Sequence, residues 1–119
     1  MKSLYEYCVN ENISAQTIFE ICSWLENTPE TIRQMEAIVK SMAKKKPETI
    51  TFERLASAST VDKLCAQGAK LAKLQLETAT RKELRKYVAA IILRMYNDET
   101  GNAVADWNSG DYNYANLDW

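Results

Sequence analysis

The chain has 119 residues, of which 46 % are hydrophobic and 26 % are charged, a composition that fits one globular domain with its own core. It contains no histidine, which excludes Ser–His, Cys–His and His–metal chemistry, and its three glycines are too widely spaced for a phosphate-binding loop. Carboxylate or lysine chemistry stays open, but we predict a protein that is not an enzyme and that uses no cofactor or metal.

The sequence carries no sign of a membrane or export signal. No apolar run approaches the roughly 18 residues that a membrane span needs. The opening residues, MKSLYEYCVNEN, lack the apolar block of a signal peptide. The cysteines Cys8, Cys22 and Cys65 form no CxxC pair, and we expect them to be reduced and mostly buried. We therefore predict a cytoplasmic protein.

The net charge of −1 hides an asymmetry along the chain. All 15 Lys and Arg lie within residues 1–97, where 11 acids leave a charge of +4. Residues 98–119 contain five acids and no base, which gives −5. This division predicts a helical domain over 1–97 and an acidic, aromatic tail over 98–119.

Capping signals predict three helices in the first half of the chain. Ser3 and Glu6 form a capping box for a short helix over 4–11, and Ser14 can cap a second helix over 15–26. Thr28 as N-cap, with Pro29 next to it, opens a third helix over 29–45. The inward stripes of the second and third helices are Ile18, Ile21, Cys22 and Leu25, widened by Phe19 and Trp24, and then Ile32, Met35, Ile38, Val39 and Met42. We expect Trp24, Ile32 and Met35 to be buried between these two helices.

The second half of the chain reads as a short connection followed by a helical hairpin. Residues 48–57 predict a short helix or turn, with a short extended piece over 49–52 as the alternative. Two capping boxes, Ser59 to Asp62 and Thr80 to Glu83, open helices over 60–77 and 81–98. Gly68 and Ala72 leave room for another helix to approach closely. The inward positions are Val61, Leu64, Cys65, Gly68, Leu71, Ala72 and Leu74, and then Leu84, Tyr87, Val88, Ile91, Ile92 and Met95. The predicted fold is all-α, a compact bundle of four to five helices, and the 60–98 hairpin is a candidate homodimer interface.

Residues 17–35, TIFEICSW-LENT-PETIRQM, lie within a helix-turn-helix-like region over 14–45 and fit that motif. The segment resembles the DNA-reading helix-turn-helix of Crp/Fnr-type bacterial regulators. The resemblance implies that Glu30, Arg33 and Gln34 reach the major groove, and Lys40 on the same helix is a further candidate contact. Two positions depart from the pattern, because Glu26 replaces the usual turn glycine and Asn27 an apolar residue. The alternative is two packed helices with a well-made cap between them.

Four basic residues at the start of the last predicted helix, with Lys63, Lys70 and Lys73 on the preceding helix, make a second candidate contact surface. Arg81, Lys82, Arg85 and Lys86 are one helical turn apart in pairs. Their charge favours binding to phosphates or to an acidic protein surface. The alternative is that they form a solvated helix face.

The tail is the third candidate surface. It carries Trp107, Tyr112, Tyr114 and Trp119 among acids and asparagines, and such rings favour docking on the body or on a partner protein. The sequence thus predicts a small DNA-binding regulator with a competing acidic tail. The alternative is an inhibitor or adaptor of the kind that phages and mobile elements encode, for example an anti-CRISPR-like protein, acting by protein–protein binding.

Overall fold

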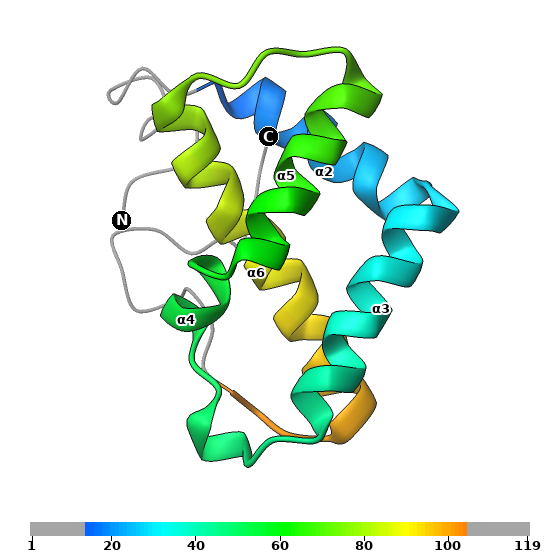
Figure 1. The fold of residues 1–119 in the computed structure, drawn as a ribbon, viewed down its shortest axis with the longest axis vertical. Coiled ribbons are helices and arrows are strands. Elements are labelled where there is room, and N and C mark those ends of the chain that lie inside the picture. The colour runs from blue at the N-terminus through cyan, green and yellow to red at the C-terminus, as the bar shows by residue number, and fades with distance from the viewer. Residues whose placement is uncertain (1–13, 105–119) are drawn as a thin grey trace.

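The computed structural model describes residues 14–104, which form five α-helices, one 3-10 helix and no strand (Figure 1). This confirms the predicted all-α bundle. The helix predicted over 4–11 and residues 105–119 of the tail lie outside the described residues. The elements are α2 (Ala15–Asn27), α3 (Pro29–Ala43), η1 (Pro47–Thr49), α4 (Phe52–Ala56), α5 (Ser59–Ala72) and α6 (Thr78–Thr100).

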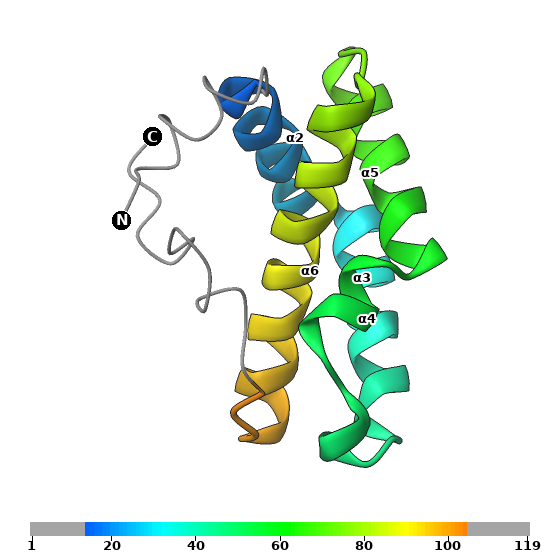
Figure 2. The ribbon, with the colours of Figure 1, turned by 90° about the vertical axis from the view of Figure 1, so that its left-hand side faces the viewer.

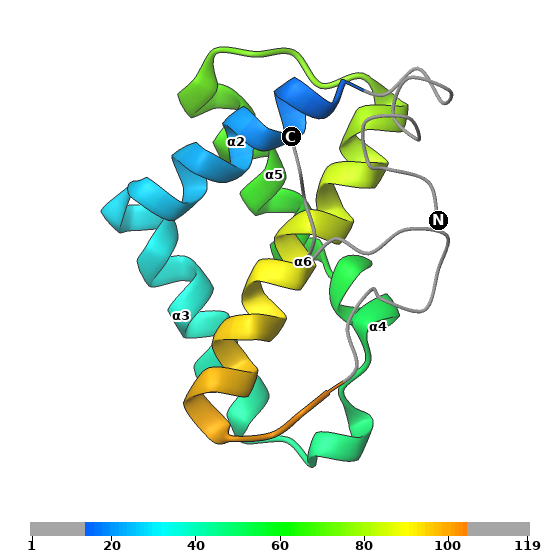
Figure 3. The same ribbon diagram turned by 180° about the vertical axis from the view of Figure 1, so that it is seen from behind.

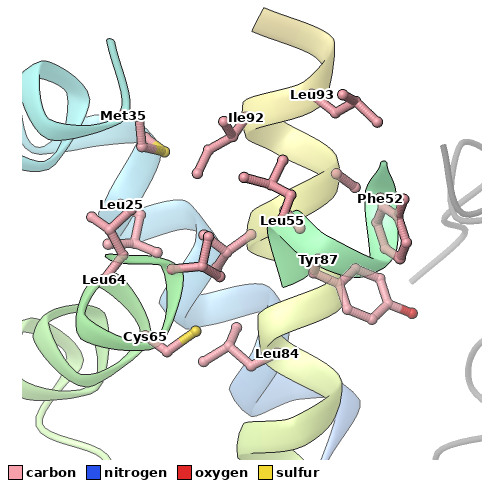
Figure 4. Close-up of a cluster of buried hydrophobic side chains, with 14 of the residues drawn as sticks. Leu25, Met35, Phe52, Leu55, Leu64, Cys65, Leu84, Tyr87, Ile92 and Leu93 are labelled. Atoms are coloured by element: carbon pink, nitrogen blue, oxygen red, sulfur yellow. The ribbon is translucent and has the colours of Figure 1, made fainter. Parts of the chain in front are cut away.

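The helix α6 is the centre of the bundle and runs the length of the molecule (Figures 2 and 3). It packs against α2, α3, α4 and α5. The consecutive residues Val88, Ala89 and Ala90 are all fully buried, so more than one face of this helix is covered at its middle. Figure 4 shows Leu25, Met35, Leu55 and other side chains from the surrounding helices converging on it. The single inward stripe predicted for this helix is therefore too narrow, since Ala89, Ala90, Leu93 and Tyr96 are buried as well.

The helices α2 and α5 approach each other closely at Gly68, as the sequence predicts. A Cβ atom built on Gly68 would lie 2.5 Å from Cγ2 of Ile21 and 3.1 Å from Cγ of Leu25. Ile21 and Leu25 are fully buried. Only a residue without a side chain allows α2 to lie this close to α5.

The bounds of α2 and α3 agree with the prediction within two residues, but the junction between them is built differently. The Ser14 hydroxyl accepts from the Thr17 amide at 3.2 Å and caps α2 as expected. Thr28 holds the N-cap position of α3, yet its side chain makes no capping bond. Its hydroxyl instead donates to the Trp24 carbonyl at 2.6 Å, and the buried Thr31 hydroxyl donates to the Leu25 carbonyl at 2.6 Å. Both threonines thus satisfy carbonyls at the end of α2.

Two apolar side chains of α2 that were expected on its inward stripe, Phe19 and Trp24, are exposed instead. Trp24 is 43 % exposed and Phe19 is 49 % exposed, so the predicted burial of Trp24 is wrong. Met35 is buried as expected, whereas Ile32 is only partly buried. The contact face of α2 is narrower than its apolar stripe because its fully buried residues are Ile18, Ile21 and Leu25, with Ala15 and Cys22 partly buried beside them.

The two capping boxes of the hairpin are not formed. The helix α5 begins at Ser59 with Ala58 as N-cap, and Asp62 turns to Arg81 on the next helix instead of to the cap. The helix α6 begins earlier, at Thr78, so Thr80 lies inside it, buried, and accepts from the Ser14 amide at 3.5 Å. Contacts between helices take over the side chains that the local pattern assigns to capping.

The hairpin itself is present, with α5 and α6 packed together, but its connection is longer than predicted. The helix α5 ends at Ala72, because Lys73 adopts a left-handed conformation with φ of 56°. The Leu74 amide bonds to the Ala69 carbonyl at 3.0 Å, which completes a Schellman-type end. Residues 73–77 then connect the two helices. Between Pro47 and Ala56 the chain forms η1 and α4, which confirms the helix-or-turn prediction for 48–57, while Ile50 and Thr51 between them have the extended backbone of the alternative.

Candidate functional site

The basic cluster at the start of α6 is largely neutralised by acids within the protein. Arg81 donates from Nε and Nη2 to the two carboxylate oxygens of Asp62, at 3.0 and 2.9 Å. Arg85 lies 3.9 Å from the same carboxylate, and Lys86 lies 3.5 Å from the buried Glu83. The hydrogen bond from Arg81 lowers the pKa of the Asp62 carboxyl. Arg81 and Arg85 therefore tie α6 to Asp62 of α5, whereas the pair of Lys86 and Glu83 lies within α6.

Lys82 differs from the other three basic residues of this cluster. It is exposed and forms no ion pair in the part of the chain that the structure describes. The cluster thus offers one unpaired charge to a phosphate, where the sequence suggested four.

The residues that the helix-turn-helix resemblance singles out lie along α3. Glu30, Arg33 and Lys40 are exposed, and Gln34 is half-buried. Residues 25–27, assigned to the turn of the motif, belong to α2, so Thr28 alone connects the two helices. This connection is shorter than the motif predicts.

The two predicted nucleic-acid-binding groups do not form one surface. In Figure 1 the start of α6 lies at the upper left, whereas α3 runs down the right-hand side. Trp107, Tyr112, Tyr114 and Trp119 of the tail lie outside the described residues.

A cleft of about 1020 Å³ opens between α3 on one side and η1, α4 and α5 on the other. It exists because α3 packs on α2 and α6 but does not pack closely on α4 or α5. We name it the α3–α5 cleft. Its lining residues are Gln34, Ala37, Ile38, Ser41, Met42, Lys45, Thr49, Ile50, Thr51, Arg54, Leu55, Ala58, Thr60, Lys63, Ala66 and Gln67.

The lining of the α3–α5 cleft combines apolar side chains with cations. Ile38, Met42, Ile50 and Leu55 supply the large apolar surface, and four residues are alanine or other small types that leave space between them. Three cationic residues line the cleft, Lys45, Arg54 and Lys63, and all are exposed. None of the described lining residues is acidic. The cleft thus pairs an apolar surface with uncompensated positive charge.

Few features of the sequence point to this cleft. Lys45 follows the last turn of α3. A cation at that position is already explained by its favourable interaction with the helix dipole, so it does not by itself indicate a binding site. Arg54 and Lys63 belong to two different helices, and Arg54 donates to the Thr49 carbonyl at 3.5 Å. Of the predicted site residues within the described range, Gln34 and Lys63 line the cleft. Ile38 of α3 and Ile50, which follows η1, are left partly buried on its walls.

The structure describes two cysteines, Cys22 and Cys65, and neither has a reactive thiol. Burial raises the pKa of the Cys65 thiol to about 12 and that of the Cys22 thiol well above its usual range. Both therefore stay protonated and poorly nucleophilic near neutral pH. Within residues 14–104 no three side chains of the metal-ligating types gather around a common point. Over the same range no helix has the length and apolar character needed to cross a membrane.

No protein-family model, no curated protein and no solved structure matches this chain.

Proposed function

We propose that the protein is a non-enzymatic regulator that binds an acidic, apolar segment of another protein in the α3–α5 cleft. The observation that carries the proposal is the lining of the cleft, in which Lys45, Arg54 and Lys63 surround apolar side chains and no acid balances them. None of these three cations forms an ion pair within the described residues. Apolar anchors supply affinity at protein interfaces, and complementary charge supplies orientation and association rate.

The dimensions of the cleft suit a short peptide segment. On α3 the lining runs from Gln34 to Met42, which at 1.5 Å per residue is about 12 Å, and Lys45 lies just beyond the end of the helix. That length matches about two turns of an amphipathic helix or about four residues of extended chain. Grooves between helices commonly bind such segments through apolar residues on one face. The partner segment is expected to combine two or three large apolar residues with flanking Asp or Glu.

Selection of random peptides displayed on phage tests the proposal. The full chain is the bait, and a double variant with Ala37→Trp and Ala66→Trp fills the cleft from both walls. Both alanines are exposed and line the cleft, so the core is untouched. Ala79→Trp, at an exposed site outside the cleft, is the matched control.

We expect selected peptides to be rich in Trp, Tyr or Leu beside acids, to bind the control, and to lose binding to the filled cleft by at least about tenfold. A tenfold loss corresponds to about 1.4 kcal/mol. Peptides that bind the filled variant as tightly as the wild type would show that the cleft is not the binding site.

DNA binding is the second candidate function. It is supported by Arg33 and Lys40, which are exposed on α3 and form no ion pair within the described residues, and by Lys82. If Arg33 reads a base, Arg33→Ala costs about 1–3 kcal/mol on a specific site, whereas Lys82→Ala weakens all sequences alike. Fluorescence anisotropy against pooled duplexes at low salt measures both. Absence of binding by the full chain and by a chain that ends at residue 104 would exclude this function.

A further inference from the structure

The last described residues fix the point at which the tail leaves the helical body. The Asn97 side chain holds Val104 with two hydrogen bonds, from Nδ2 to the Val104 carbonyl at 3.2 Å and from the Val104 amide to Oδ1 at 3.1 Å. Asn102 donates to the Tyr96 hydroxyl at 2.9 Å, and Val104 packs against the core. Residues 101–104 run from the end of α6 toward α4 (Figures 1 and 3). The helix α4 forms one wall of the α3–α5 cleft.

The tail is chemically complementary to the cleft. Residues 105–119 contain three aspartates, four large aromatic residues, one leucine and no basic residue. The described part of the chain, residues 14–104, carries 14 basic and 11 acidic residues, and three of those bases line the cleft. Opposite charges attract over about 8–10 Å at physiological ionic strength, and cations stack favourably on Trp and Tyr rings. The tail mixes aspartates with aromatic residues, and the cleft lining mixes cations with apolar side chains.

The tail is also long enough to reach the cleft. Its 15 residues span up to about 50 Å when extended, and the longest dimension of the molecule is 38 Å.

We propose that residues 105–119 occupy the α3–α5 cleft of the free protein, so that a partner segment binds only by displacing them. This inference rests on the proposed function of the cleft and adds its regulation. A tether of this kind presents the tail at an effective concentration of about 1 mM. If the isolated tail binds with a Kd of about 0.1–1 mM, the tethered tail lowers the affinity for any competing segment about 2- to 10-fold.

Binding of a fluorescein-labelled peptide with the sequence of residues 105–119 tests the proposal, with the full chain as receptor and anisotropy as readout. In one receptor variant Trp107, Tyr112, Tyr114 and Trp119 are changed to Ser, which weakens the chain's own tail. This variant is expected to bind the labelled peptide about 2- to 10-fold more tightly than the wild type does.

Charge reversal locates the binding site. The cleft variant carries Lys45→Glu, Arg54→Glu and Lys63→Glu, and the matched control carries Lys70→Glu, Lys73→Glu and Lys82→Glu, the same change of net charge at exposed sites outside the cleft. The cleft variant is expected to lose the peptide, and the control to retain it within about twofold. Circular dichroism checks the fold of each variant. If the cleft variant fails to fold, the Ala37→Trp and Ala66→Trp variant blocks the cleft without a change of charge and is expected to give the same loss.

Two results overturn the inference. One is no saturable binding of the peptide up to about 1 mM, because a tail that weak would not dock even when tethered. The other is binding that is insensitive to both cleft variants. If phage-selected peptides still require the cleft in either case, only the regulation by the tail fails. If they do not require it, the proposed function fails as well.

Discussion

Replacing Gly68 with alanine tests the close contact between α2 and α5. The change has two opposing effects on stability, a gain in helix propensity and a steric clash of the added Cβ, and both are large enough to measure. In the interior of a helix this change is worth about 1 kcal/mol in favour of folding. Here the added Cβ would lie 2.5 Å from Cγ2 of Ile21, about 1 Å inside an ordinary carbon–carbon contact. That methyl group is attached directly to Cβ of a fully buried, β-branched residue, so it cannot turn aside freely. Overpacking of this kind costs about 1–3 kcal/mol.

The expected net result is a loss of about 0–2 kcal/mol in the free energy of unfolding, measured by urea denaturation with circular dichroism. Ala66→Gly, at an exposed site of the same helix, is the control and should cost about 1 kcal/mol from propensity alone. Ile21→Ala combined with Gly68→Ala should cost less than the sum of the two single changes, because the clash is removed. A Gly68→Ala protein that is more stable than the wild type by the full 1 kcal/mol would refute the close approach.

Three further predictions concern the core and the ion pair. Met35→Ala should cost about 2–5 kcal/mol in urea denaturation and Ile32→Ala clearly less, because Met35 is only 2 % exposed and Ile32 is partly exposed; equal losses would contradict the packing of α3. A double-mutant cycle on Asp62 and Arg81 should give a coupling of about 0.2–1 kcal/mol, since both side chains are more than a third exposed. The lowered pKa of Asp62 means that this stabilisation is present above the carboxyl's unfolded pKa and is lost as the pH falls through its folded pKa, so Asp62→Asn should flatten the acid limb of the stability curve. The Cys65 thiol, with a pKa of about 12, should react with a thiol reagent only at the rate at which the protein unfolds; fast labelling of the native protein at pH 8 would show that it is accessible.

The sequence predicts α2 and α3 well because their signals are local. Ser14 caps its own helix, Pro29 can occupy only a first turn, and Pro47 prevents continuation of α3. Each of these acts through the backbone of its neighbours, whatever the rest of the chain does. Bounds that depend on such residues are therefore predictable from the sequence.

The hairpin illustrates the limit of local signals. Ser59 and Thr80 each precede an acid by three residues and so fit a capping box, yet each lies within its helix in the structure. Asp62 gains two charge-assisted hydrogen bonds from Arg81, 19 residues away, which outweigh one bond to a cap. Cap energies are about 1 kcal/mol, so a tertiary contact of similar size can redirect the side chain.

The same reasoning explains why the candidate site could not be predicted from a motif. Arg81, Lys82, Arg85 and Lys86 form the conspicuous basic cluster of the sequence, but Asp62 and Glu83 neutralise most of it. The three cations of the cleft are nine residues apart, at 45, 54 and 63, and lie on or beside three different helices. No local pattern links them, because they share a surface only where α3 stays apart from α4 and α5.

The position of the cleft follows from how the central helix is covered. Four helices cover α6, and α4, only five residues long, contributes Phe52 and Leu55 to that cover. A helix this short supplies enough apolar surface to protect α6 but too little to fill the space beside α3 as well. Ile38 and Ile50 are left partly exposed on the two sides of that space. Burying about 100 Å² of such apolar surface under a bound segment is worth about 2.5 kcal/mol before the entropy of ordering that segment is counted. Binding would thus stabilise the part of the fold that packs least. Occupancy of the cleft, by the tail or by a partner, should therefore raise the free energy of unfolding, and a segment that binds more tightly should raise it more.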